Sequence, residues 1–139
     1  VLFRSRMKNG KEHQVPLCQT ALDLLEVARS LDPDSQYLFS KNRKHLSNMA
    51  MLMCAKRIDH SITVHGFRST LRDWVSEESD HNPEVVEMAL SHTIRNKVEA
   101  AYRRGKLLER RRLLMRDWES YCLTGQWRNE IELEEKTIA

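Results

Sequence analysis

The chain has 139 residues, of which 40% are hydrophobic and 31% are charged, and its formal net charge is +3. This length is enough to bury one sizeable core, while so small a net charge is weak support by itself for a nucleic-acid partner. No apolar run approaches the roughly 20 residues of a membrane-spanning helix, so we expect no membrane association. Three widely spaced cysteines, Cys18, Cys54 and Cys122, argue against a disulfide framework or a zinc cage and fit a reducing cytoplasm.

The start of the chain predicts a β-hairpin. Residues 1–5, VLFRS, join abruptly to the neighbouring stretch, and we treat them as a non-native leader. In that stretch, RMKNGKEHQVPL, the pair Asn9-Gly10 supplies the positive φ angles that a two-residue hairpin turn requires. This turn places Lys8 near the hairpin tip, where a lysine ordinarily serves solubility.

Two helices are predicted between this hairpin and the middle of the chain. The first covers residues 19–31 and ends at Asp32-Pro33, because a residue before proline is pushed out of the α region. A short extended piece, QYLF, lies at residues 36–39. The second helix covers residues 47–57 with Ser47 as its cap. Both have apolar faces, made in the first by Leu22, Leu25, Ala28 and Leu31, and in the second by Met49, Leu52, Met53 and Ala55.

Further helices are predicted in the second half of the chain. One begins near Thr63 and buries a stripe of Phe67, Leu71, Trp74 and Val75. The next starts at Asn82-Pro83, directs Val85, Val86, Ala89 and Leu90 inward, and stops near Ser91-His92. A short helix over residues 96–104 ends at Gly105. A long helix then runs through Leu107, Leu108, Leu114, Met115, Trp118 and Cys122 to Gly125. The predicted fold is therefore mainly α, with a small N-terminal β-hairpin.

Charge is distributed unevenly over the last third of the chain. Seven Lys or Arg residues and one Glu lie from Arg103 to Arg116, whereas the segment after Gly125 is acidic. The basic region is consistent with an anionic partner, but a solvated helix face has the same composition. Both interpretations stay open.

Basic side chains also lie on one flank of the helix that contains VHGFRSTLRDW. His65, Arg68 and Arg72 have the spacing i, i+3 and i+7, which brings them within about 60° of one another around a helix. Such a group is a candidate anion site, because the guanidinium offers a rigid fork of donors that matches phosphate oxygens. The alternative is a solvated basic edge with a partly buried histidine.

Two other residues have both a structural and a functional interpretation. His92 lies just after the end of a helix, where the negative end of the dipole favours a hydrogen-bonding imidazole, but a helix-capping role would look the same. Tyr102, in SHTIRNKVEAAYRR, lies on the apolar side of its helix with Val98 and Ala101. A tyrosine there usually packs its ring and exposes its hydroxyl.

The order of these features resembles a known family. A lysine in a hairpin, HxxR at a helix start, a histidine after an apolar helix and a tyrosine ten residues later resemble the C-terminal catalytic domain of the tyrosine recombinases. The stretches HGFRSTLRDW and ALSHTIRNKVEAAYRRGKLLERRRLLMRDW are similar to prophage and genomic-island integrases. The resemblance implies an incomplete catalytic domain over residues 6–125, and composition predicts an acidic tail over residues 126–139.

The resemblance also implies a role for each candidate residue. Tyr102 would attack a DNA phosphodiester to form a 3′-phosphotyrosyl link, with His65 as its acid/base partner. Arg68 and His92 would bind the phosphate, and Lys8 would protonate the leaving 5′-oxygen. No metal or other cofactor is implied, because the covalent link conserves the energy of the phosphodiester. Three more basic residues are candidates for ordinary phosphate contacts, namely Arg72, Arg95 and Lys97.

The family implies partners and a limit on activity. Double-stranded DNA attachment sites would be the substrate, and the full-length protein would be a homo-oligomer, a tetramer on DNA, in the bacterial cytoplasm and associated with the nucleoid. The family carries another catalytic arginine upstream of the hairpin, so we expect little or no strand cleavage by these 139 residues alone. A non-catalytic DNA-binding or interaction remnant is the alternative, and an unrelated helical regulator would make Tyr102 and Lys8 coincidences.

Overall fold

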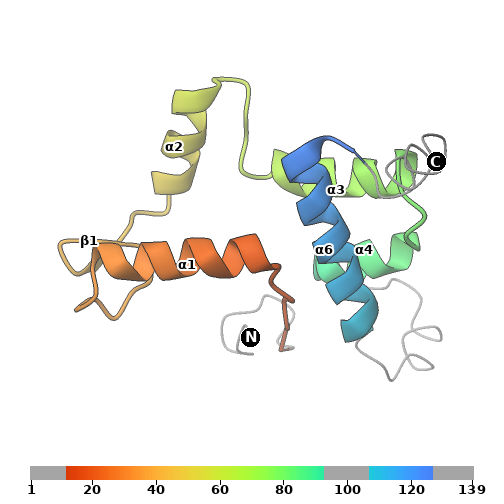
Figure 1. Cartoon of the computed structure of the whole chain (residues 1–139). Helices are drawn as coiled ribbons and strands as arrows, with labels where there is room; N and C mark the ends of the chain where they lie inside the picture. Colours follow the sequence, from red (N-terminus) through yellow and green to blue (C-terminus); the bar gives the residue numbers. More distant parts are fainter. Residues whose placement is uncertain (1–11, 93–106, 127–139) are drawn as a thin grey trace, which may run out of the picture. The chain divides into compact units, whose positions relative to one another are not determined.

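The computed structural model describes residues 12–92 and 107–126 (Figure 1). Their helices and strands are α1 (Gln19–Leu31), β1 (Ser40–Lys41), β2 (Lys44–His45), α2 (Ala50–Ile58), α3 (Gly66–Glu77), α4 (Pro83–Ala89) and α6 (Leu108–Thr124). The chain divides into two compact units, one of residues 19–70 and one of residues 1–18 and 71–139, and the division falls within α3. A mainly helical fold is therefore confirmed for the described residues.

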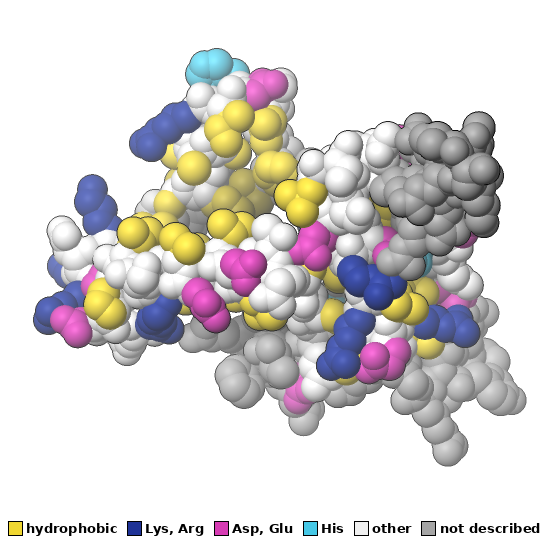
Figure 2. Space-filling view, viewed as in Figure 1, with side chains coloured by type: hydrophobic (Ala, Val, Ile, Leu, Met, Phe, Trp, Pro, Cys, Tyr) yellow, Lys and Arg dark blue, Asp and Glu magenta, His cyan; other side chains and the backbone are white. Residues whose placement is uncertain are grey.

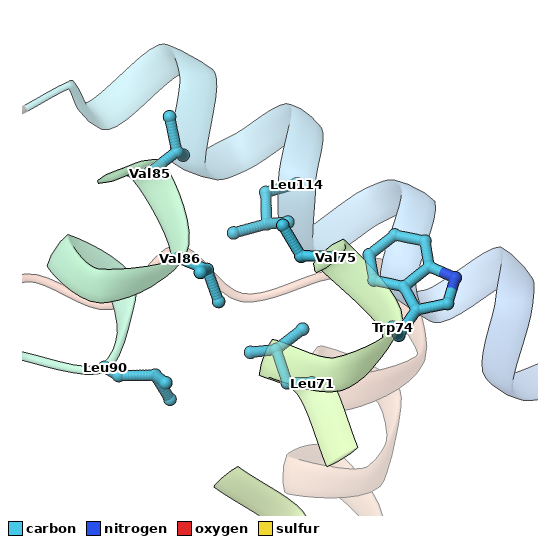
Figure 3. Close-up of a cluster of buried hydrophobic side chains, with 7 residues drawn as sticks. All are labelled: Leu71, Trp74, Val75, Val85, Val86, Leu90 and Leu114. Atoms are coloured by element: carbon cyan, nitrogen blue, oxygen red, sulfur yellow. The ribbon is translucent and has the colours of Figure 1, made fainter. Parts of the chain in front are cut away.

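The core of the second unit lies among α3, α4 and α6. Figure 3 shows Leu114 of α6 beside Val75 of α3, with Val86 of α4 and Leu71 of α3 pointing into the same space. Leu114 is fully buried, and Val75 and Val86 are 2% and 1% exposed. Trp74, Val85 and Leu90 complete the buried cluster. Apolar burial of this kind is the main favourable contribution to folding.

The stripe predicted for α3 is confirmed only in part. Leu71, Trp74 and Val75 are buried, but Phe67 is 57% exposed. The helix begins at Gly66, and the preceding turn is held by Thr63, whose hydroxyl oxygen accepts the Gly66 N–H at 3.0 Å. Phe67 thus lies in the first turn of α3 and outside the buried cluster, which includes Leu71, Trp74 and Val75 from the later turns.

Local signals predicted α4 and the end of α6 correctly. The side chain of Asn82 accepts the Glu84 N–H at 2.8 Å, and Pro83 occupies the first turn of α4, as expected for a cap followed by proline. At the other end of the unit, Gly125 closes α6 with a positive φ of 72°. Only glycine adopts that conformation without steric cost.

The buried face of α6 is more polar than predicted. Leu114 lies on it together with Arg111 and Asp117, which are 3% and 7% exposed. Cys122 is exposed, whereas Tyr121 packs against the core. Positions 111, 114, 117, 118 and 121 recur at i, i+3 and i+4 spacing, so they share the side that faces α3 and α4.

Asp117 is buried beside an aromatic cluster. His81 Nε2 and Asp117 Oδ2 are 3.1 Å apart, with side chains 16% and 8% exposed. The ring of Trp74 lies 5.2 Å from that of Trp118 and 6.0 Å from that of His81, between centroids. A buried carboxylate requires such a hydrogen-bonding partner, because its desolvation would otherwise be costly.

The unit of residues 19–70 contains a hairpin that the sequence analysis missed. β1 and β2 pair antiparallel with Ser40 opposite His45. Their two-residue turn, Asn42-Arg43, has φ angles of 54° and 62°, although arginine is unusual where φ is positive. Asp32 supports the turn by accepting the Arg43 N–H at 3.0 Å and the Ser40 hydroxyl at 2.5 Å. The predicted extended piece at residues 36–39 consists of bends instead.

The helices of this unit bury less than predicted. α1 has the predicted bounds, but Leu22 and Leu31 are exposed, and no α1 residue is fully buried. α2 begins at Ala50, with Met49 rather than Ser47 at its cap, and Ala55 is its buried residue. Met49 and Met53, predicted on the apolar face of this helix, are exposed, and Figure 2 shows hydrophobic side chains on the visible surfaces of α1 and α2. A unit of about 50 residues can bury only a limited share of its apolar surface.

Other predicted elements lie outside the described residues. They are the hairpin at Asn9-Gly10, the short helix over residues 96–104 and the acidic segment from residue 127 onward. Within residues 12–92 and 107–126, no helix combines the length and the apolar character needed to cross a bilayer.

Replacing Leu114 with alanine tests the core. We expect Leu114→Ala to lower the free energy of unfolding by about 2–5 kcal/mol, because it leaves a cavity among the three helices. Leu113→Ala is the matched control, since Leu113 is 47% exposed, and should cost about 0.5 kcal/mol. Urea denaturation measures both, and equal losses would contradict the assigned core.

The hairpin contact of Asp32 can be tested by titration. Hydrogen bonds from Ser40 and from the Arg43 backbone lower the pKa of Asp32 below its ordinary value of 3.8. Because the folded pKa is depressed, the contribution of Asp32 to stability is present above its unfolded pKa and is lost as the pH falls through its folded pKa. Carboxyl NMR should give a midpoint below 3.8, and Ser40→Ala should raise it. A midpoint that Ser40→Ala leaves unchanged would refute the contact.

Candidate active site

The end of α4 places His92 through a defined C-terminal cap. Ser91 has a positive φ of 57°, and its N–H donates to Met88 O at 3.1 Å. The N–H of His92 donates to Glu87 O at 2.9 Å. This pair of hydrogen bonds is the Schellman motif, which usually has glycine where Ser91 stands.

Glu87 joins two of the predicted site residues. One oxygen of its carboxylate, Oε1, lies 3.1 Å from Nε of Arg72. The other, Oε2, accepts a hydrogen bond from Nδ1 of His92. Arg72 on α3 and His92 after α4 are therefore brought together by one carboxylate at the end of α4.

This contact fixes the protonation of one ring nitrogen of His92. An ionised carboxylate has only acceptor atoms, so Nδ1 must carry the proton that it shares with Glu87. Nε2 is then the ring nitrogen directed away from Glu87. The side chain of His92 is 42% exposed, so part of it faces solvent.

The buried core of this unit fixes the positions of Arg72, Glu87 and His92. Leu71 precedes Arg72 and Val86 precedes Glu87, and both apolar side chains belong to the buried cluster around Leu114. Leu90, two residues before His92, is 9% exposed and belongs to the same cluster. Packing of α3 and α4 thus sets where the three polar side chains emerge.

His65 and Arg68 lie in the unit of residues 19–70, at the start of α3. The Arg68 N–H donates to His65 O at 3.0 Å, so the two residues are one turn apart. His65 is exposed and Arg68 is half-buried. His65 also lines an open groove with Met51 and Leu52 of α2. The start of α3 is tightly built, because a Cβ at Gly66 would lie 3.1 Å from Thr63 Oγ1.

The segment just after the predicted Lys8 hairpin contacts α4 and α6 of its own unit. His13 Nε2 lies 3.1 Å from Ala89 O, at the end of α4. The buried Arg111 guanidinium donates from Nη2 to Gln14 O, and burial lowers the pKa of Arg111. Arg111 therefore serves structure, and the basic turns of α6 are not all available to an anionic partner.

The remaining predicted site residues lie outside the described ranges. They are Lys8, Arg95, Lys97 and Tyr102, and their roles stay predictions. In the part of the chain that the structure describes, no group of three or more His, Cys, Asp or Glu side chains is arranged to hold a metal ion.

Glu87 is the residue that sequence reasoning missed. It contacts Arg72 across two helices, and no sequence spacing indicates such a contact. A weak signal exists in the five-residue separation of Glu87 and His92, because the residue after a helix cap returns toward the last turn.

Substitution of Ser91 tests the cap. Ser91→Gly should raise the free energy of unfolding by up to about 1 kcal/mol, because glycine adopts a positive φ without steric cost. Ser76→Gly, at an exposed helical position of α3, should instead lower it by about 0.5–1 kcal/mol. Thermal unfolding of both variants measures the difference, and destabilisation by Ser91→Gly would contradict the observed backbone conformation.

Comparisons with known proteins agree with the resemblance found in the motifs. No protein-family model matches the chain, and no solved structure matches it. The chain is 33% identical over 119 residues to prophage integrase IntA of Escherichia coli K12 and 31% identical over 123 residues to the integrase of Enterobacteria phage P4. It is 29% identical over 116 residues to prophage integrase IntZ of Escherichia coli K12.

These matches include most of this chain and a smaller part of each relative. They cover 81–83% of the chain but 28–29% of the relatives, so the chain spans less than a third of their length. The resemblance to prophage integrases is confirmed. Over about four fifths of its length, the chain is homologous to the phage and prophage integrases.

Proposed function

We propose that the chain supplies the strand-cutting chemistry of a site-specific tyrosine recombinase. The observation that carries the proposal is its homology to three phage and prophage integrases over about four fifths of its length. The order of His65, Arg68, His92 and Tyr102 along the sequence gives that homology a chemical interpretation. The proposal concerns the full-length protein acting on double-stranded DNA attachment sites as a homo-oligomer in the cytoplasm.

In the proposed reaction, the phenolic oxygen of Tyr102 attacks the phosphorus of one DNA strand. A bond forms between this oxygen and phosphorus, and the bond from phosphorus to the 5′-oxygen breaks. The proton of Tyr102 passes to His65, and Lys8 supplies a proton to the leaving 5′-oxygen. Attack by a 5′-hydroxyl on the phosphotyrosyl link reverses these steps and rejoins the strands, with no net consumption of energy.

A free phenol has a pKa near 10 and is a weak nucleophile at neutral pH, so the proposed site must activate it. Arg68 and His92 donate hydrogen bonds to the non-bridging oxygens, where negative charge develops. Donors aimed at such charge contribute about 3–4 kcal/mol each in well-formed sites. Positioned proton transfer adds about 10²- to 10⁴-fold in rate.

The proposed phosphate contacts outside the reacting group come from Arg72, Arg95 and Lys97. The exposure of Arg72 supports this role, because its side chain is 62% exposed although it pairs with Glu87. Contacts of this kind set affinity and salt dependence rather than sequence preference. We further propose that these 139 residues alone cleave little DNA, since they span less than a third of the matched integrases.

Tyr102→Phe in the full-length protein tests the proposal. On a nicked duplex that carries the attachment site, the unmodified protein should form a covalent adduct that survives denaturing electrophoresis. Tyr102→Phe should abolish this adduct, because it removes the nucleophilic oxygen, and should leave the gel-shift affinity for DNA unchanged.

Tyr37→Phe is the matched control for the loss of a phenolic hydroxyl. Tyr37 is 37% exposed and its ring packs against His45, so this variant should retain the adduct. An adduct that persists in Tyr102→Phe would exclude Tyr102 as the nucleophile. DNA binding without any adduct in the unmodified protein would favour the non-catalytic remnant.

A further inference from the structure

We propose that Glu87 is a positioning residue for strand cleavage: its carboxylate fixes the ring of His92 so that Nε2 is presented to the scissile phosphate. This inference rests on the proposed function, in which His92 binds that phosphate. It assigns a role to a carboxylate next to an anionic substrate, where a negative charge would ordinarily be unfavourable.

Glu87 constrains His92 at two points. Its backbone oxygen accepts the His92 N–H at 2.9 Å, and its carboxylate accepts the Nδ1 proton. The first contact fixes where the chain leaves α4, and the second fixes the rotation of the ring about its side-chain bonds. Two independent contacts between the same pair leave the imidazole little freedom.

Arg72 in turn constrains Glu87. Each carboxylate oxygen has its own partner, with Oε1 on Arg72 and Oε2 on His92, so rotation of the carboxylate would break both contacts. The Arg72–Glu87 pair is partly exposed, at 62% and 35%, and a pair of this kind contributes little to stability. The main effect of this pair is therefore to orient the Glu87 carboxylate, and it adds little to the stability of the fold.

Charge balance explains how a carboxylate is tolerated beside DNA. The positive charge of Arg72 offsets the negative charge of Glu87, with Nε and Oε1 3.1 Å apart. An approaching phosphate therefore meets no net negative charge from the pair. In the complex, the imidazolium donates Nδ1–H to Glu87 and Nε2–H to a phosphate oxygen. Both ring protons are then used, as a doubly protonated imidazole allows.

The first test measures the ring directly and needs no DNA. Long-range proton–nitrogen NMR of the chain should show His92 with its proton on Nδ1 at a pH where the ring is neutral. Glu87→Gln should reduce that tautomer, because the amide can also donate a proton to Nδ1. Glu84→Gln, on the same helix, should leave it unchanged. A neutral His92 ring that carries its single proton on Nε2 in the unmodified chain would overturn the proposal, whether or not the variants fold.

The second test connects the contact with catalysis in the full-length protein. At saturating DNA, Glu87→Gln should slow adduct formation about 10- to 100-fold, the loss seen when the partner that orients a metal-binding histidine is removed. In a His92→Ala background, the same substitution should have no further effect, because Glu87 acts through His92. An equal slowing in both backgrounds would refute this role.

The two tests separate this inference from the proposed function. Persistence of the adduct in Tyr102→Phe would disprove the proposed nucleophile, whereas the tautomer of His92 is measured without any reaction. An Nδ1 proton lost in Glu87→Gln, together with an unchanged cleavage rate, would show that the contact exists but does not position a catalytic group, and would overturn this proposal alone.

Discussion

Burial of Leu114 among α3, α4 and α6 is the interaction on which the described site depends. It holds Leu71 and Val86 in one cluster, and each precedes a polar residue of the site. Because neighbours on a helix point in different directions, burying one side chain determines where the next one emerges. Arg72 and Glu87 can therefore meet at 3.1 Å although 15 positions of sequence separate them. The polar contacts add little stability, and the apolar core determines their geometry.

A second constraint comes from how α4 ends. Ser91 has a left-handed backbone conformation, which is unfavourable for a residue with a side chain. This conformation turns the chain back, so that His92 contacts Glu87 through both its backbone and its side chain. A strained position next to a candidate catalytic residue is consistent with strain retained for function. The same end of α4 also receives the segment after the predicted Lys8 hairpin, through His13 and the carbonyl of Ala89.

The parts of the fold that could be predicted are those specified by neighbouring residues. Asn82, Pro83 and Gly125 act within one turn of themselves, and the helix boundaries they predict are correct. The turn at Asn42-Arg43 could not be predicted, because it depends on Asp32, about ten residues earlier. Arg111 was grouped with surface charge, but it is buried against Gln14, and charge counts do not reveal such a partner. Glu87 was missed for the same reason, since its significance arises between helices. The resemblance to integrases was predicted from the order of motifs along the chain, which can be read without knowledge of tertiary contacts.

The central claim is that one phenolic oxygen of this chain becomes bonded to DNA phosphorus. Mass spectrometry of a trapped, nuclease-trimmed and protease-digested complex tests it most directly. The account predicts a nucleotide joined through its 3′-phosphate to the peptide that contains Tyr102. A nucleotide attached to any other side chain of the protein, or joined through a 5′-phosphate, would contradict it.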